Sequence, residues 1–395
     1  MFDNKGLRRI AGLRGIFFLA LSIGPPSPAR ALPSGRAWVP ITKQSVPGYD
    51  YVASPVIQID GSGVPIMLGN ARVFSAAMKD AILFRWGGDT WTEAWRLGRG
   101  TSLVWPALYQ DGDPYVVWGG LETHGPQRSW LVLAQVSASG IVQADTVSDR
   151  FVSAVEYAAA VGPDRRWAVL DDVKNLRLFY RDSLGPWNEV PAEGEGDFGV
   201  SIAGLDASTA LVVWAGIPEG LRWGILSGST WNPDPNQLAS RAIRPQLRPR
   251  PSGGLWMAWA ADEEYLGVRA YVNGAWTQAE SLLCAYLDPT AQHFVEQPEL
   301  TRDDSEYPSV AWVYQNSFAG TGICVCMSSD AGFGQAEELP GTQNSNVPTM
   351  ARDRNGDLWL AWWTYWDGIF WTHTYTTATS TTPRVLSNRA LVAVV

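Results

Sequence analysis

The side chains in this chain that could do chemistry are aromatic rings with carboxylate, amide or imidazole neighbours, gathered in short polar segments. A ring can cover the C–H face of a sugar, while carboxylates and amides can bind its hydroxyls. On this basis we predict twelve ligand-binding residues: His124, Asp171, Asp172, Glu195, Asp262, Glu263, Tyr265, Tyr314, Trp363, Tyr365, Trp366 and Asp367. The plainer interpretation of each of these residues is a solvated loop side chain.

Carboxylates in the same set could also catalyse. A glycosidase needs two carboxylates at a defined separation, and Asp171, Glu195 and Asp262 are the candidates. Local sequence does not encode the separation between loops, so we assign no catalytic residue. A hydrolase or lyase acting on a neutral or cationic polysaccharide is therefore an alternative to a non-catalytic binding protein.

Metal ligation has little support in the sequence. Residues 353–357 (Asp-Arg-Asn-Gly-Asp) have the spacing of a Ca²⁺ loop but lack its distal glutamate, so a plain Asn-Gly turn is favoured. His124, His293 and His373 lie in different repeats and show no ligand spacing. We expect neither a metal nor another cofactor.

The three cysteines allow two arrangements. Cys324 and Cys326 lie on one face of a predicted strand, because side chains recur on a face every second residue. One disulfide could join Cys284 to either of them and leave the third thiol buried. Three buried free thiols are the alternative.

A repeat predicts the elements that position these residues. At intervals of 44 to 53 residues, a short apolar strand ends on a large side chain, usually Trp. These column residues are Leu68, Trp118, Leu170, Trp214, Trp259, Trp312 and Trp362. A period of this length is the signature of a repeat architecture.

Each repeat predicts four strands. A strand opens near a proline, turns, and returns to the column residue, so that Pro245 to Trp259 and Pro348 to Trp362 both span 14 positions. A Gly-x-Thr-Trp hairpin follows, complete in 88–91 and 228–231, where the glycine supplies the positive φ of a tight turn. Four short strands per repeat make one blade of a β-propeller.

The predicted fold class is therefore all-β: a seven-bladed β-propeller of four-stranded blades. Strands such as 210–214 (Ala-Leu-Val-Val-Trp) are continuously apolar because each blade packs against a neighbour on both faces. We expect most of the 21 Trp to fill the wedges between blades. Repeats one and three have Leu in the column, so six or eight blades stay open as alternatives.

The first residues predict export. A basic stretch, the apolar segment 16–23 and Ala29-Arg30-Ala31 fit a signal peptide over residues 1–31. Residues 51–395 form a single propeller domain. Within the intervening residues 32–50, a strand near 38–41 could close the ring, but the last repeat (347–395) is also long enough to complete its own blade. We expect a secreted protein of the bacterial periplasm or the extracellular space.

Charge and hydropathy restrict the partners. A net charge of −9 argues against nucleic acid and anionic membranes, which call for a basic patch. After the apolar segment at the start there is no run of 18 apolar residues, so no membrane span is predicted. We expect a monomer that binds a glycan or a protein.

Together, these motifs resemble the sialidase-type Asp-box (BNR-like) propellers of secreted bacterial proteins. The box of that family reads Ser-x-Asp-x-Gly-x-Thr-Trp; residues 328–332 keep its first half, while 88–91 and 228–231 keep its second. In that family the box is a structural turn between the third and fourth strands, opposite the ligand funnel. The resemblance implies that the loops after the column residues, and those joining blades, form the ligand face. A weaker resemblance, through 83–95, is to bacterial propeller lectins.

Sialidase activity itself is disfavoured. It requires a cluster of arginines to bind a carboxylate, and the first repeat opens with residues 51–55 (Tyr-Val-Ala-Ser-Pro) in place of the family's Arg-Ile-Pro. We therefore predict a non-catalytic recognition propeller that binds glycan or protein at its ligand face. The alternatives are a glycoside hydrolase or polysaccharide lyase of the sialidase-like type, and a structural or assembly protein.

Overall fold

The computed structural model describes 32 strands and no helix in the following residues: 36–47, 49–72, 79–100, 107–111, 113–121, 129–137, 140–148, 154–162, 164–172, 175–182, 185–192, 199–216, 220–261, 265–282, 293–301, 306–316, 320–329, 332–334, 336–364 and 367–376. The predicted signal peptide, residues 1–31, lies outside this part of the chain. In the part described, no helix has the length and hydropathy to cross a bilayer.

Within these residues the strands form seven antiparallel sheets of four or five strands. The first four sheets follow the chain in order. They are β3 (Tyr51–Ile59), β4 (Pro65–Arg72), β5 (Lys79–Trp86) and β6 (Trp91–Gly100); β7 (Ala107–Asp111), β8 (Asp113–Leu121), β9 (Ser129–Ser137) and β10 (Gly140–Ser148); β11 (Ala154–Val161), β12 (Arg165–Asp172), β13 (Asn175–Asp182) and β14 (Asn188–Val190); and β15 (Val200–Gly204), β16 (Thr209–Gly216), β17 (Gly220–Ser227) and β18 (Thr230–Pro233).

The last three sheets depart slightly from this pattern. The fifth has an extra outer strand, the sixth is accompanied by a two-stranded hairpin, and the seventh takes strands from the start of the chain. They are β19 (Ala242–Pro249), β20 (Leu255–Ala261), β21 (Tyr265–Val272), β22 (Ala275–Trp276) and β23 (Glu280–Leu282); β24 (His293–Leu300), β25 (Val310–Asn316), β26 (Gly320–Cys326) and β29 (Glu337–Glu338), with the hairpin β27 (Ser328–Ser329) and β28 (Gly332–Phe333); and β30 (Ser345–Arg352), β31 (Leu358–Thr364), β32 (Gly368–Thr376), β1 (Arg36–Trp38) and β2 (Thr42–Gln44).

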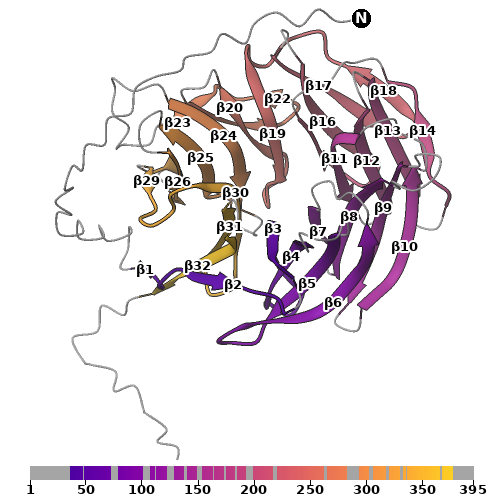
Figure 1. The fold of residues 1–395 in the computed structure, drawn as a ribbon. Coiled ribbons are helices and arrows are strands. Elements are labelled where there is room, and N and C mark those ends of the chain that lie inside the picture. Colours follow the sequence, from indigo (N-terminus) through magenta and orange to yellow (C-terminus); the bar gives the residue numbers. More distant parts are fainter. Residues whose placement is uncertain are drawn as a thin grey trace, which may run out of the picture.

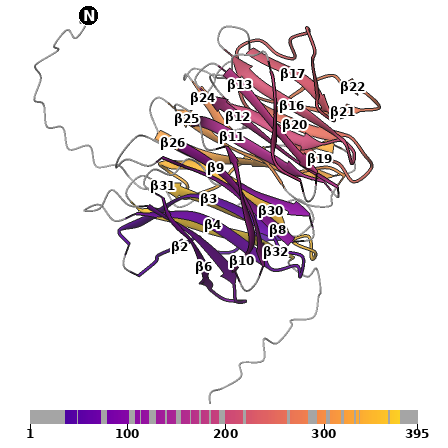
Figure 2. The ribbon, with the colours of Figure 1, turned by 90° about the vertical axis from the view of Figure 1, so that its right-hand side faces the viewer.

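The sheets follow one another around a closed ring. The first strand of each sheet contacts the first strand of the next, from β3 through β7, β11, β15, β19 and β24 to β30, and β30 in turn contacts β3. Figure 1 shows the indigo strands of the first sheet beside the yellow strands of the seventh, and Figure 2 shows the same neighbours from the side. This arrangement confirms the predicted all-β propeller of four-stranded blades.

The start of the chain supplies the outer strands of the seventh sheet. Residues 36–44, here called the closing segment, contain β1 and β2, which both pair with β32 in antiparallel register. Between the two strands, the Val39 N–H donates to the His373 carbonyl at 2.8 Å, and the Thr372 hydroxyl donates to the Val39 carbonyl at 2.6 Å. Among the described residues, the outer strands of the seventh sheet are therefore supplied by residues 36–44.

The column residues lie on the second strand of each sheet and form the core. Six of them are 3% exposed or less: Leu68, Leu170, Trp214, Trp259, Trp312 and Trp362. All of these except Leu68 lie in a core shared between their own sheet and a neighbour, which is the packing role predicted for the column.

In the seventh sheet the proline predicted near the start of the first strand sits at a bulge inside that strand. The β30–β31 register shifts between Asn346 and Thr349, on either side of Pro348, and Val347 has a φ of 47°. The first strand has one unpaired edge, so a residue without an N–H is tolerated there and the extra residue is accommodated as a bulge. The Gln297 amide oxygen accepts the Val347 N–H at 2.5 Å and ties the sixth sheet to the seventh.

The predicted turns have the expected local geometry. Gly88 and Gly228, between the third and fourth strands, have φ values of 105° and 60°. Between β30 and β31, one Asp353 carboxylate oxygen accepts the N–H groups of Asn355 and Asp357, both at 2.9 Å. This carboxylate therefore caps a turn within its own loop, as the plain-turn interpretation requires.

The cysteines on β26 differ in state. Cys324 is disulfide-bonded, and Cys326 is a buried free thiol whose Sγ donates to the Gly334 carbonyl at 3.1 Å. Burial, with Glu280 and Glu337 nearby, raises the pKa of the Cys326 thiol to about 12. The third cysteine, Cys284, lies outside the described residues.

Candidate functional site

The structure describes half of the twelve predicted site residues. Asp171 and Asp172 end β12, where their backbones pair with Leu176 and Asn175 on β13. The six residues outside the described part of the chain are His124, Glu195, Asp262, Glu263, Tyr365 and Trp366. The remaining four are Tyr265, Tyr314, Trp363 and Asp367.

Three of these four are rings packed into the protein. Tyr314 is 8% exposed, because β25 continues past Trp312 and its side chain returns to the same buried face two residues later. Burial and a hydrogen bond to the Glu338 carboxylate raise the pKa of its hydroxyl. Tyr265 is half-buried against the core between the fourth and fifth sheets, and Trp363 against the core between the seventh and first.

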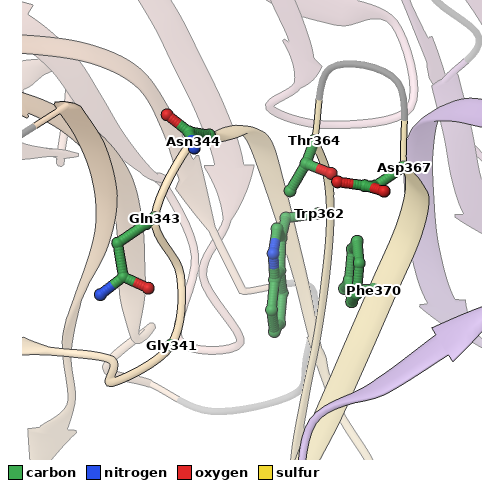
Figure 3. A pocket seen from close by; sticks show the side chains of 7 residues that line it. All are labelled: Gly341, Gln343, Asn344, Trp362, Thr364, Asp367 and Phe370. Atoms are coloured by element: carbon green, nitrogen blue, oxygen red, sulfur yellow. The ribbon is translucent and has the colours of Figure 1, made fainter.

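Asp367 is exposed and lies at the rim of a hollow of about 370 Å³. The hollow is formed by the connection from β29 to β30, the end of β31 and the start of β32 (Figure 3). Its lining residues are Gly341, Gln343, Asn344, Trp362, Thr364, Asp367 and Phe370. A second-to-third-strand turn and a sheet-to-sheet connection meet here, so the hollow is on the face expected to carry the ligand loops.

Two stacked rings form one wall of the hollow. Trp362 on β31 and Phe370 on β32 are direct cross-strand partners, with ring centroids 6.3 Å apart and planes inclined by 18°. Figure 3 shows the two rings side by side and nearly parallel, below Thr364 and Asp367. Trp362 is 1% exposed, so it is a fixed wall rather than a mobile surface side chain.

Thr364 brings a buried hydroxyl to the hollow. The residue is 8% exposed, and its Oγ1 has no hydrogen-bond partner. A buried hydroxyl left without a partner costs about 1–3 kcal/mol. Figure 3 shows this hydroxyl on the same side of the rings as the Asp367 carboxylate.

A pair of opposite charges stands beside the rings. Lys43 on β2 places its Nζ 3.8 Å from the Asp367 carboxylate and 6.0 Å from the centroid of the Phe370 ring. The side chains are 50% and 67% exposed, so water screens much of their attraction. The exposed residues Gln343 and Asn344 line the hollow from the β29–β30 connection.

Of the predicted site residues, Asp367 lines the hollow; the other polar residues around it were not among those predicted. Asp367 carried a signal, since it follows an aromatic run after a column residue. In the sequence, Thr364 has the context of an ordinary strand residue, and Gln343 and Asn344 have the context of loop residues without aromatic neighbours. Lys43 is more than 300 positions from Asp367 and reaches it only through ring closure.

The hollow is equipped for binding. Among its lining residues Asp367 is the one carboxylate, whereas glycoside hydrolysis uses a pair. In the described part of the chain, no three His, Cys, Asp or Glu side chains gather closely enough to hold a metal ion. Aromatic faces, amides, a hydroxyl and one carboxylate form a set that can bind a hydroxylated ring reversibly.

Comparisons with known proteins place the fold among propellers. No family model and no curated protein sequence matches this chain. The solved structures that match include two with a TM-score above 0.5. The first is a protein of unknown function from Dyadobacter fermentans (12% identity, 87% of this chain, 100% of that chain, TM-score 0.54). The second is the α-L-arabinanase of Penicillium chrysogenum complexed with arabinobiose (11% identity, 86% of this chain, 99% of that chain, TM-score 0.51).

More distant matches include a lectin and sialidase-type propellers. The Aleuria aurantia lectin in complex with α-methyl-L-fucoside has 11% identity over 76% of this chain and 98% of that chain, with a TM-score of 0.48. Trans-sialidases from Ruminococcus gnavus and leech have TM-scores of 0.42 and 0.43.

Proposed function

We propose that this protein is a glycan-recognition propeller that binds a neutral sugar ring in the hollow between its sixth and seventh sheets. The observation that carries the proposal is the buried, unpartnered hydroxyl of Thr364, which lies beside the Asp367 carboxylate and over the Trp362–Phe370 wall. A hydroxyl-bearing ligand forms hydrogen bonds with the Thr364 hydroxyl and the Asp367 carboxylate, and its ring packs against the Trp362–Phe370 wall.

Each group around the hollow has a counterpart on a sugar. The Asp367 carboxylate accepts from ligand hydroxyls, and hydrogen bonds to a charged group are worth about 1.5–3 kcal/mol. The amides of Gln343 and Asn344 both donate and accept. The C–H face of the ring covers the aromatic wall. The volume of about 370 Å³ falls within the range of about 300–1,000 Å³ that small-molecule sites occupy.

Binding without catalysis is the better supported of the two glycan functions. The two carboxyl groups of a glycosidase lie roughly 5–9.5 Å apart across the scissile bond, and the described lining offers Asp367 alone. The likeness to an arabinanase is one of fold, since identity is 11%.

We also propose that the protein acts outside the cytoplasm. The disulfide at Cys324 supports this location, because disulfides persist in oxidising compartments. The signal-like residues 1–31 support it independently.

Titration calorimetry against a panel of methyl glycosides tests the function. The panel contains the neutral glycosides of glucose, galactose, mannose, xylose, arabinose and fucose, together with methyl glucuronide and methyl glucosaminide. We expect a neutral glycoside to bind, and Thr364→Val and Asp367→Asn each to weaken it about tenfold, which corresponds to roughly 1.4 kcal/mol.

Matched controls are available on the opposite face. Thr92→Val and Asp89→Asn make the same chemical changes at exposed positions in and beside the β5–β6 turn, and should leave binding unchanged. If no glycoside of the panel binds, or if both site variants bind as the wild type does, the proposal is wrong. Turnover of chromogenic glycosides would establish the hydrolase instead.

A further inference from the structure

The closing segment contacts the hollow as well as completing the ring. Its strand β2 lies along β32 with Lys43 opposite Phe370 (Figure 1). Lys43 Nζ is 3.8 Å from the Asp367 carboxylate and 6.0 Å from the centre of the Phe370 ring. A Cβ placed on Gly341 would stand 3.3 Å from the Ile41 Cδ1 atom. Three lining residues of the hollow therefore touch this segment.

The closing segment is held by few interactions. Its strands β1 and β2 have three residues each, and most of its side chains are exposed or half-buried. Trp38 and Ile41 pack against the core between the sixth and seventh sheets, and Val39 packs against the core between the seventh and first. A short edge strand with little buried area is among the first parts of a fold to open locally.

We propose that the closing segment is a functional part of the glycan site, with Lys43 as a specificity residue, so that ligand binding and docking of the segment stabilise each other. This inference rests on the function proposed above. At 3.8 Å, the Lys43 ammonium and the Asp367 carboxylate attract each other without a direct hydrogen bond. A sugar hydroxyl both donates and accepts, so one hydroxyl can accept from Lys43 and donate to Asp367.

The paired charges select a neutral ring. A sugar carboxylate would be repelled by Asp367, and a sugar ammonium would be repelled by Lys43. A hydroxyl-rich neutral ring meets neither penalty and bridges both groups. Without Lys43, the described lining would carry one uncompensated negative charge, and the preference would move toward a cationic sugar.

Ligand binding and docking of the closing segment must strengthen each other by the same free energy. A ligand that uses Lys43 binds the docked state more tightly than the undocked state, so it raises the population of the docked state. By the same coupling free energy, docking raises the affinity for the ligand. The N–H of Val39, bonded to the His373 carbonyl, reports docking because it exchanges with solvent when the segment opens.

Two measurements on the purified chain test the inference: calorimetry with the same panel of methyl glycosides, and hydrogen exchange at Val39 with and without each glycoside. We expect a bound neutral glycoside to slow exchange at Val39 about tenfold. Lys43→Ala should weaken that glycoside about tenfold and shift the preference toward methyl glucosaminide. Thr42→Ala is the matched control: its exposed hydroxyl donates only to the Pro40 carbonyl, at 3.3 Å.

The outcomes separate this inference from the function on which it rests. If a neutral glycoside binds, but exchange at Val39 is unchanged and Lys43→Ala keeps the affinity and preference of the wild type, the inference is wrong and glycan recognition stands. If no glycoside of the panel binds the wild type, the inference and the proposed glycan recognition are both wrong. A shift in preference toward the amino sugar supports the role of Lys43, because loss of packing alone would weaken all sugars alike.

Discussion

Replacing Thr364 with Val should make the protein more stable while it weakens sugar binding about tenfold. Val has the shape of Thr without the hydroxyl, and Thr364 is 8% exposed with an Oγ1 that has no hydrogen-bond partner. Removing a buried unsatisfied hydroxyl recovers its desolvation cost, and we expect a gain of about 1 kcal/mol in the free energy of unfolding. Most single substitutions in a core have the opposite sign.

Thr349 provides a control with the same change and the opposite expectation. It is 2% exposed, and its Oγ1 accepts the Ile57 N–H at 3.1 Å across the junction of the seventh and first sheets. Thr349→Val leaves that buried N–H without a partner, which should cost about 1–3 kcal/mol. The two variants therefore distinguish a hydroxyl that is available to a ligand from a hydroxyl that stabilises the fold.

Urea unfolding followed by tryptophan fluorescence measures both variants, and a shift in midpoint at constant slope reports the change in stability. Thr364→Val should have the higher midpoint and Thr349→Val the lower, relative to the wild type. If Thr364→Val loses as much stability as Thr349→Val, the Thr364 hydroxyl is satisfied in the folded protein, and the main support for the proposed site is gone.

Three further predictions concern the fold. Trp259→Ala should lower the free energy of unfolding by about 3–5 kcal/mol, because this column indole is 3% exposed, and urea unfolding would show it. Cys326, with its pKa raised to about 12, should resist thiol-modifying reagents at pH 8 until denaturant is added; fast labelling of the folded protein would contradict its burial. Burial and Glu338 raise the pKa of Tyr314 above its unfolded value, so its stabilising contribution is complete below about pH 10 and is lost as the pH rises further. Between pH 10 and 11, Tyr314→Phe should therefore lose less stability than the wild-type protein does. If both proteins lose the same amount, the Tyr314 hydroxyl titrates normally.

The sequence predicted the repeat better than the site, for a physical reason. Column residues and hairpin glycines act within their own strands and turns, so their spacing predicts a blade wherever it recurs. The hollow depends on contacts between segments far apart in the chain. Lys43 and Asp367 are brought together by ring closure, and Thr364 is distinguished by a buried hydroxyl that lacks a hydrogen-bond partner, which is a property of the folded state.

In two other sheets an aromatic side chain lies across a glycine of the neighbouring strand. On β21, Gly267 lies opposite Trp259, and a Cβ there would stand 2.2 Å from the indole, so the ring of Trp259 lies across the glycine. Tyr314 lies across Gly322 in the same way, with 2.6 Å to its ring. In both places the aromatic side chain fills the space that a cross-strand side chain would take.

The seventh sheet has Phe370 in that position. Its ring prevents the Trp362 indole from lying across β32, so the two rings stack side by side with their planes inclined by 18°. The space above them is bounded by the β29–β30 connection and by the end of the closing segment rather than by another indole. At this junction the cross-strand pair Trp362–Phe370 thus forms an aromatic wall, and ring closure adds Lys43 beside it.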